Sequence, residues 1–384
     1  MYDAIVVGAR CAGSPAAMLL ARKGHRVLLL DRARFPSDTL STHFIQLPGV
    51  ARLARWGILD RVVATGAPTI TEGRLDIDGN SVTTDFPVPA GLPGLNAPRR
   101  TVLDEVLVDA AVAAGAELRE GVMIDSVIIK DGRVVGVRGH GPEGPTLEER
   151  ARIVVGADGR NSIVARSVGA EFLEHTDALG GGYYSYWGGV ECPGAELYLH
   201  EGLFTAAFPT NDGLTTIAIV MPTERFREVR KDEDRKVPEL LDTLGDLGTR
   251  LRAGRRKHQL VRVGSLPNFV RNAAGPGWAL VGDAAYHKDP TPADGITDAY
   301  RGADLLAAAI DDYLSERAGD EDALDRYRRE LEAAARPRLD KTIGMSSFDR
   351  SAGDRATAFL EIQQLHADEA SRLMTEGERA TAPV

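Results

Sequence analysis

The first 31 residues contain a strand, a loop with glycines, a helix and a second strand, and this order constrains the fold more than any other feature of the chain. Asp3 to Val7 form an apolar run that predicts a strand, and Gly8 to Gly13 predict a loop. Pro15 suits the first turn of a helix, which we expect to end near Gly24. Residues 26–30 predict the second strand. A βαβ unit of this kind implies a parallel sheet.

A loop between a strand and a helix suits a nucleotide, because the free N–H groups at the helix start attract a pyrophosphate. Arg10 stands where the middle glycine of a dinucleotide fingerprint is expected, and its guanidinium offers a different contact to phosphate. Asp31 ends the second strand, where a carboxylate accepts hydrogen bonds from the adenosine ribose. The residues predicted to bind in the loop are Gly8, Arg10, Cys11, Ala12 and Gly13. An ordinary glycine turn remains an alternative for this motif alone.

The composition is that of a globular protein with about two to three domains. The chain has 384 residues, 43% of them hydrophobic, and a formal net charge of −10, which argues against nucleic acid as a partner. Two cysteines make neither a disulfide framework nor a zinc spacing, so a reducing compartment fits best. No apolar stretch is long enough for a membrane span, and no charged leader precedes the first strand. We therefore expect a cytoplasmic protein.

Further elements follow from turn residues and periodicity. Residues 71–87 and 122–138 predict hairpins with turns at Asp78-Gly79 and Asp131-Gly132. Apolar positions at helical spacing predict a helix from about Thr101 to Ala114.

Residues 151–155 and 278–281 predict short buried strands, and the alternating, aromatic segment 183–220 predicts an antiparallel sheet. From Ile296 onward the pattern is helical. The expected fold is α/β, a discontinuous Rossmann-like nucleotide-binding domain with an inserted antiparallel sheet and C-terminal helices. The expected nucleotide domain comprises residues 1–70, 97–170 and 272–340, the sheet domain residues 71–96 and 171–271, and the last segment, a cap or a partner surface, residues 341–384.

Two further motifs follow the short strands. Gly156-Ala157-Asp158-Gly159 comes after the first, and Gly282-Asp283 after the second, continuing through Pro290 to Ile296 at a helix start. A carboxylate at a strand end can bind a sugar-alcohol hydroxyl. A Pro/Gly loop that enters a helix directs N–H groups at one point, which suits a flavin ring that becomes negative on reduction.

With three such motifs in this order, the chain resembles the flavoprotein monooxygenases of the para-hydroxybenzoate hydroxylase fold. Their superfamily also includes flavin-dependent halogenases and geranylgeranyl reductases, and the resemblance spans residues 3 to about 310. It implies an FAD cofactor, and it implies that Asp158 also takes part in NAD(P)H binding. The resemblance assigns cofactor contacts to Asp31, Arg32, Arg100, Asp158, Asp283, Pro290, Ala293, Gly295 and Ile296.

Candidate residues on the substrate side come from three segments. In the superfamily the loop at residues 34–43 passes beneath the isoalloxazine, so His43 is a candidate catalytic residue, with a structural histidine as an equal alternative. Alternation places Tyr184 and Tyr186 on one face of a strand, and we assign them with Phe208 to the substrate pocket, with a core role as the competitor. For His287 and Lys288 we expect a solvated loop, with binding of the nicotinamide cofactor or of an anionic substrate as the alternative.

The resemblance implies an FAD-dependent monooxygenase that hydroxylates or epoxidises a small aromatic, polyketide or isoprenoid-like substrate with molecular oxygen, through a flavin hydroperoxide. The chain has no second glycine fingerprint, so NAD(P)H would dock transiently at the flavin, or a separate flavin reductase would supply the electrons. The alternatives are a flavin-dependent reductase of an isoprenoid double bond and a non-catalytic flavin-binding subunit. A tryptophan halogenase motif is absent, and no lysine can be assigned to halogenation.

Overall fold

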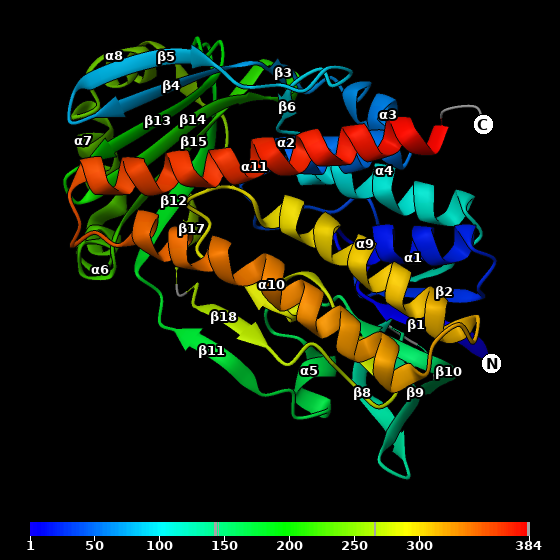
Figure 1. The fold of residues 1–384 in the computed structure, drawn as a ribbon. Coiled ribbons are helices and arrows are strands. Elements are labelled where there is room, and N and C mark those ends of the chain that lie inside the picture. The colour runs from blue at the N-terminus through cyan, green and yellow to red at the C-terminus, as the bar shows by residue number, and fades with distance from the viewer. Residues whose placement is uncertain (142–143, 145, 265, 382–384) are drawn as a thin grey trace.

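A mainly parallel sheet contains the N-terminal strands of the computed structural model, which describes residues 1–141, 144, 146–264 and 266–381 (Figure 1). The strand order along its main path is β19-β20-β10-β1-β2-β7, and all pairs except β19–β20 are parallel. This confirms the βαβ opening. The strands are β1 (Tyr2–Val7), β2 (Val27–Asp31), β7 (Glu117–Glu120), β10 (Thr146–Gly156), β19 (Ala274–Gly275) and β20 (Trp278–Leu280).

Three helices pack beside one another next to this sheet: α1 (Gly13–Arg22), α4 (Arg100–Ala113) and α9 (Gly295–Leu314). Figure 1 shows α1 between the other two, and α1 contacts both. Leu103 and Leu107 of α4 are buried, as the helical spacing of its apolar residues requires. The predicted helix is therefore confirmed, with its start one residue earlier.

Both predicted hairpins form at the predicted turns. They are β4 (Glu72–Ile77) with β5 (Asn80–Asp85), and β8 (Met123–Lys130) with β9 (Arg133–His140). Asp78 and Asp131 each adopt positive φ, at 48° and 50°, and each is followed by a glycine that does the same. Such turns match the twist of the flanking strands, which is why the Asp-Gly pairs located them.

The second sheet has the strand order β16-β12-β15-β14-β13-β4-β5, and β17 also pairs with β12. It is antiparallel as expected except at one pair, since β13 and β4 run parallel. The two strands are far apart in the sequence, so no tight turn sets their relative direction. Its further strands are β12 (Gly180–Gly188), β13 (Ala195–His200), β14 (Leu203–Thr210), β15 (Leu214–Pro222), β16 (Arg255–Arg256) and β17 (Val261–Val263).

Three helices that the sequence did not predict follow β15: α6 (Thr223–Val229), α7 (Glu233–Asp242) and α8 (Gly245–Ala253). Their apolar residues form a core with the sheet, in which Phe226 packs on Tyr183 at 5.3 Å between ring centroids. Smaller elements complete the chain up to α9. They are α2 (Leu47–Arg55), α3 (Leu59–Val63), α5 (Ile163–Ser167), β3 (Thr69–Ile70), β6 (Leu95–Asn96), β11 (Phe172–Thr176), β18 (Asn268–Arg271) and β21 (Tyr286–His287).

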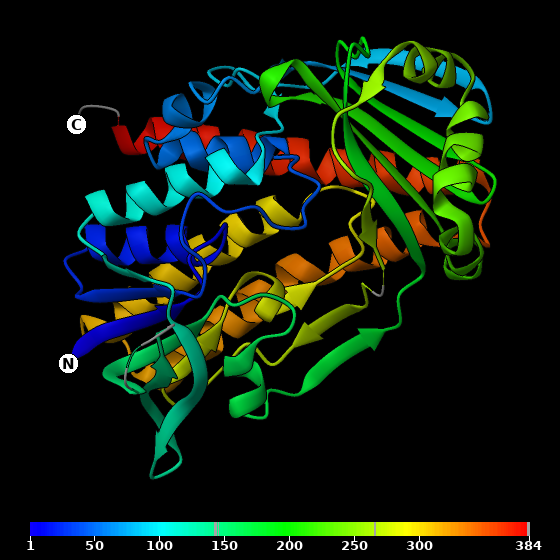
Figure 2. The same cartoon turned by 180° about the vertical axis from the view of Figure 1, so that it is seen from behind.

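The C-terminal part is helical, as predicted. Helix α10 (Asp320–Ser346) packs on α9, and α11 (Ala352–Thr381) packs on α2, α10 and β13. Figures 1 and 2 show α11 spanning the molecule from the second sheet to α2. Ile362 and Ala370 of α11 are buried in one cluster with Phe204 and Phe208 of the sheet, so one face of this helix caps the core. Among the described residues, no helix has the length and apolar character to cross a membrane.

Candidate functional site

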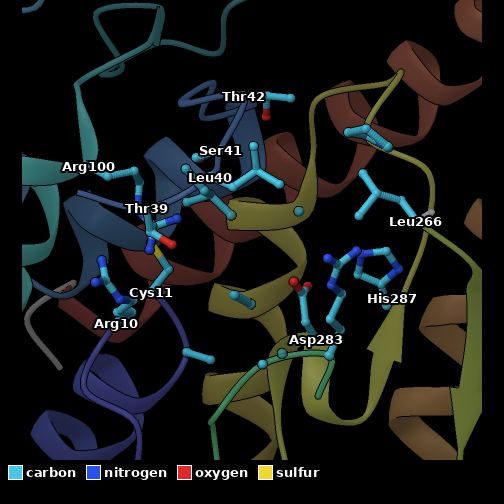
Figure 3. A pocket seen from close by; sticks show the side chains of 18 of the residues that line it. Arg10, Cys11, Thr39, Leu40, Ser41, Thr42, Arg100, Leu266, Asp283 and His287 are labelled. Carbon is cyan, nitrogen blue, oxygen red and sulfur yellow. The ribbon is translucent and has the colours of Figure 1, made fainter. Parts of the chain in front are cut away.

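A cavity of about 840 Å³ reaches from the N-terminal glycine loop to the strands of the second sheet. Figure 3 shows Arg10, Cys11 and Arg100 on one side of it and Asp283, His287 and Leu266 on the other. All predicted cofactor-binding residues except Gly13 line this cavity. The lining members are Gly8, Arg10, Cys11, Ala12, Asp31, Arg32, Arg100, Asp158, Asp283, Pro290, Ala293, Gly295 and Ile296. Four distant parts of the sequence, at residues 8–32, 100, 158 and 283–296, therefore converge on one space.

The glycine loop packs too closely for side chains at its two ends. A Cβ at Gly8 would lie 2.4 Å from the carbonyl oxygen of Ala157, and one at Gly13 only 1.7 Å from that of Gly8. Gly13 therefore seats α1 against the loop from behind, which explains why it does not reach the cavity. Gly8 has φ 101°, a conformation that favours glycine.

The Asp31 carboxylate holds the loop in place. Its two oxygens accept hydrogen bonds from the backbone N–H groups of Ala9 at 2.6 Å and Ala33 at 2.7 Å. A carboxylate has about four acceptor sites, so this arrangement leaves capacity for ribose hydroxyls. Asp31 is thus available for the predicted ribose contact and is also a structural residue of the loop.

Arg10 and Arg100 converge on Asp104, which the sequence reasoning missed. Arg10 Nη1 lies 2.6 Å from Asp104 Oδ2, and Arg100 donates to both carboxylate oxygens at 3.0 Å. The Asp104 side chain is fully buried, while Arg10 and Arg100 line the cavity. Two cations and one anion leave a net positive charge, which complements a pyrophosphate. The i,i+4 spacing of Arg100 and Asp104 on a predicted helix was a signal that could have revealed this partner.

Of the two carboxylate oxygens of Asp158, one accepts hydrogen bonds from the described residues and the other does not. Its Oδ2 accepts hydrogen bonds from the N–H groups of Ile163 at 2.6 Å and Val164 at 3.3 Å, at the start of α5. Its Oδ1 is buried and has no hydrogen-bond partner among the described residues. Burial raises the pKa of Asp158, against the opposing effect of Ser162 and the backbone N–H groups. A buried polar atom without a partner is costly, so this oxygen fits a ligand donor.

The loop from Asp289 to Ile296 forms the opposite wall and leads into α9. The N–H groups of the first turn of a helix have no acceptor within the helix, so they are free for a ligand. A Cβ on Gly295 would meet no protein atom within 4 Å, whereas Gly295 itself lines the cavity. The open space beside Gly295 can admit a flat ring, and the positive end of the helix would stabilise that ring when it accepts electrons.

The second sheet closes the far end of the cavity. Of the predicted substrate residues, Tyr184 and Phe208 line it, whereas Tyr186 and the candidate catalytic residue His43 do not. The other lining residues from this sheet and the segment after it are mostly apolar. They are Tyr183, Phe204, Ala206, Thr216, Ala218, Ile219, Val220, Val263 and Leu266.

His43 lies behind this wall, fully buried, with φ 61°. Its Nε2 forms a short hydrogen bond with the Tyr186 hydroxyl, and its ring stacks on Tyr186 and meets Tyr184 edge-on. Burial, followed by the charges of Arg100 and Arg99, lowers the pKa of His43 to about 3. The ring is therefore neutral, and of the two tyrosines that it contacts, Tyr184 lines the cavity.

The expectation of a solvated loop at residues 287–288 is wrong. His287 and Lys288 are both buried and both line the cavity. The Lys288 ammonium lies 2.6 Å from Asp294 and 2.8 Å from Asp298. Burial of a lysine is possible here because two carboxylates from the same loop and helix neutralise it.

Two curated proteins have a similar sequence over different shares of their length. Protein FixC of Salmonella typhi is 33% identical over 183 residues, which cover 44% of this chain and 39% of FixC. The chain thus spans about two fifths of the length of the curated relatives that match it first. Digeranylgeranylglycerophospholipid reductase of Methanocella arvoryzae is 27% identical over 372 residues, which cover 88% of this chain and 85% of the reductase.

Two solved structures have the same fold. The flavin-dependent brominase Bmp2 superposes with a TM-score of 0.82 at 18% identity, covering 97% of this chain and 92% of Bmp2. PqsL of Pseudomonas aeruginosa, described as a probable FAD-dependent monooxygenase, gives 0.81 at 20% identity, covering 93% and 99%.

The family comparison covers all three motifs. The model of the FAD binding domain matches residues 1–342, from the glycine loop to α10. The cavity fits that cofactor by its positive end at Arg10 and Arg100, the unpartnered oxygen of Asp158 and the open space at Gly295. The chain therefore belongs to the FAD binding domain family, and FAD is its cofactor.

Proposed function

We propose that the protein is an FAD-dependent monooxygenase that hydroxylates or epoxidises a small, neutral organic substrate. One observation carries the proposal: the same cavity that holds the cofactor motifs continues between apolar strands of the second sheet. Among the described residues, those of the second sheet that line the cavity include no charged side chain. A charged substrate would lose its hydration there without gaining a partner, so a neutral one is favoured.

The roles of the chain's own residues follow from this geometry. When bound, reduced FAD supplies the electrons that activate molecular oxygen. The start of α9 at Gly295 and Ile296 lines the cavity, so its N–H groups and positive dipole would stabilise negative charge on a bound flavin ring. Phe204, Phe208 and Val220 exclude water from the substrate side, which protects reactive oxygen species from side reactions.

The electron donor is part of the proposal. NAD(P)H docks transiently at the flavin, with Asp158 as a contact, because the chain has one glycine fingerprint and that one serves FAD. A separate flavin reductase is the other possible source. Comparing steady-state turnover on NADH and NADPH with turnover on an added reductase separates these donors.

Thr216 gives the substrate site its polar anchor. Its hydroxyl is buried, has no hydrogen-bond partner among the described residues, and its residue lines the cavity. We expect Thr216→Val, which keeps the side-chain shape, to raise KM by about 2- to 12-fold, the equivalent of one neutral hydrogen bond of about 0.5–1.5 kcal/mol. Thr205→Val is the matched control, because the Thr205 hydroxyl is equally buried and unpartnered but lies outside the cavity lining. Equal KM values for the two variants would remove Thr216 from the substrate site.

A flavin-dependent reductase of an isoprenoid double bond is the second candidate. The similarity to the Methanocella arvoryzae reductase over 88% of this chain favours it. Halogenation is not proposed, because Lys288 is the one lysine among the described cavity-lining residues and its ammonium is held by Asp294 and Asp298.

Labelled oxygen distinguishes the two candidates. Neutral aromatic, polyketide and isoprenoid compounds are first screened for stimulated NAD(P)H oxidation by the FAD-loaded protein. The product from the best compound is then analysed by mass spectrometry after turnover under labelled dioxygen. We expect one labelled oxygen atom per product molecule and equal consumption of NAD(P)H and oxygen. Unlabelled product that forms equally well without oxygen would contradict monooxygenation and favour the reductase.

A further inference from the structure

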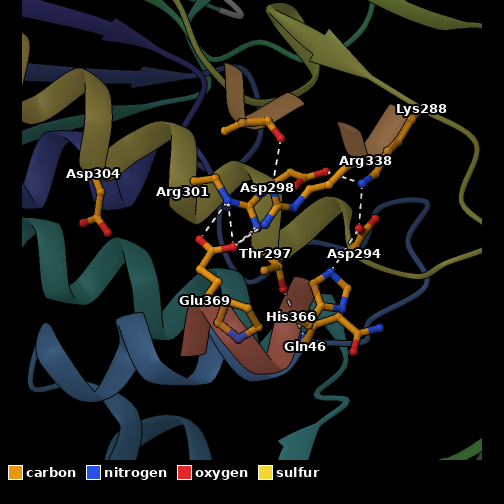
Figure 4. A network of polar contacts seen from close by, with 12 residues as sticks. Gln46, Lys288, Asp294, Thr297, Asp298, Arg301, Asp304, Arg338, His366 and Glu369 are labelled. Atoms are coloured by element: carbon orange, nitrogen blue, oxygen red, sulfur yellow. Dashed lines mark hydrogen bonds and ion pairs between the residues drawn. The ribbon is translucent and has the colours of Figure 1, made fainter. Parts of the chain in front are cut away.

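A cluster of buried and half-buried charged side chains adjoins the cavity-lining loop at residues 289–296 (Figure 4). We call it the loop cluster. It consists of Arg52, Lys288, Asp294, Asp298, Arg301, Asp304, Arg338 and Glu369, together with His366. Four cations balance four anions, so the cluster as a whole is neutral when His366 is uncharged.

One half of the loop cluster forms part of the cavity wall. Lys288 lies between Asp294 and Asp298, and both Lys288 and Asp298 line the cavity. Asp294 directly precedes Gly295, where α9 begins at the cavity wall. A shift of this half would therefore move the start of α9 relative to the ring.

The other half converges on Glu369 of α11. Its carboxylate pairs with Arg301 of α9 at 2.7 Å, Arg338 of α10 at 2.6 Å and Arg52 of α2 at 2.8 Å. Burial alone would raise the pKa of Glu369, but the guanidiniums, Arg301 foremost, hold it below its ordinary range. Arg301 also pairs with Asp298, which joins the two halves. Glu369 therefore fixes three helices through one ionised group.

His366 approaches the loop from the same face of α11, one turn before Glu369. Its Nε2 lies 3.3 Å from Asp294 Oδ2, and its side chain is fully buried. Burial lowers the pKa of His366, so the ring is neutral and the charge balance holds. Both residues lie beyond residue 342, where the match to the FAD binding domain ends.

We propose that Glu369 and His366 are positioning residues for the flavin: through Arg301 and Asp294 they fix the start of α9 and keep the charge behind it balanced. The proposal depends on FAD binding and not on monooxygenation. A balanced cluster leaves the dipole of α9 as the main positive potential at the ring. Loss of the Glu369 charge would add one uncompensated positive charge.

The first test is Glu369→Gln in the full-length holoprotein, which keeps the side-chain size and removes the charge. We expect reduced FAD to gain at least tenfold in affinity relative to oxidised FAD, which raises the two-electron midpoint potential by about 30 mV or more. Reductive titration without oxygen or substrate measures this potential. The result is independent of the catalysed reaction, so a wrong proposed function would not affect it.

Glu196→Gln is the matched control. Glu196 is as buried as Glu369 and pairs with Arg250 at 2.5 Å and 2.9 Å, but neither Glu196 nor Arg250 lines the cavity or belongs to the loop cluster. We expect both variants to lower the thermal unfolding midpoint, and the potential to change only in Glu369→Gln. An unchanged potential in Glu369→Gln, with a loss of stability like that of the control, would show a merely structural role and overturn the proposal.

His366→Gln gives a second measurement, which also serves if Glu369→Gln does not fold. It changes no charge in the loop cluster, so the potential should remain constant, while FAD affinity falls at least about twofold because Asp294 at the start of α9 loses its buried contact with the imidazole. Calorimetric titration of the apoprotein with FAD measures the affinity. Unchanged affinity in a folded His366→Gln variant would remove His366 from the proposal.

Discussion

Replacing His43 by glutamine should remove a pH dependence from the stability of the protein. His43 is fully buried and neutral, and its pKa lies at about 3 in the folded chain, against about 6.5 for an ordinary histidine. At a pH between these two pKa values, His43 binds a proton in the unfolded chain but not in the folded chain. The neutral ring therefore disfavours the folded state increasingly as the pH falls below about 6.5.

The size of the effect follows from the two pKa values. One pKa unit corresponds to about 1.36 kcal/mol, and pH 5 lies about 1.5 units below the unfolded value. From about pH 7 to about pH 5, wild type should lose about 2 kcal/mol of unfolding free energy that His43→Gln does not lose. Solvent does not screen a charge on this side chain, because the His43 side chain has no exposed surface.

Denaturant unfolding of both proteins at the two pH values measures this difference, and the comparison cancels the titration of all other groups. The control is His175→Gln, because His175 is exposed. If wild type and His43→Gln lose the same free energy, the folded pKa of His43 is close to its ordinary value and the buried, neutral ring is refuted.

Three further predictions concern the cofactor. Asp31→Ala should weaken FAD binding by about 1.5–3 kcal/mol, the scale of hydrogen bonds to a charged group, and unchanged calorimetric affinity in a folded variant would exclude the ribose contact. Arg10→Ala should lose affinity on the same scale, whereas full affinity in Arg10→Gly would show that Arg10 serves only its ion pair with Asp104. Gly295→Val should fold, since a Cβ at this position meets no protein atom within 4 Å, but should lose most FAD binding or most turnover; normal affinity and turnover would place the flavin elsewhere.

Local patterns in the sequence located the elements that form the cofactor site. The opening βαβ unit, the Asp-Gly hairpins and the strands before Asp158 and Asp283 all depend on residues close together in the chain. Parallel strands that end in loops bring those loops to the same edge of a sheet, so the convergence of the three motifs also followed from the sequence.

Three kinds of feature did not follow from local patterns. Helices α6–α8 carry Pro238 within α7 and two glycines within α8, which conceal helical periodicity. The parallel pairing of β4 with β13 joins strands from distant parts of the chain. The partners of Arg10 and Arg301, namely Asp104 and Glu369, are neighbours only in the folded molecule.

The buried carboxylates of Asp104 and Glu369 give the glycine loop and the loop at residues 289–296 different net charges. At the glycine loop, Arg10 and Arg100 share Asp104 and leave a positive charge, which an anionic pyrophosphate can neutralise. Beside the loop at residues 289–296, Glu369 makes the loop cluster neutral, although three arginines surround the Glu369 carboxylate. A positive cluster there would favour the reduced flavin permanently and oppose its reoxidation. The role proposed for Glu369 makes α11 part of the cofactor site through its charge, although none of its described residues lines the cavity and the helix lies outside the matched region.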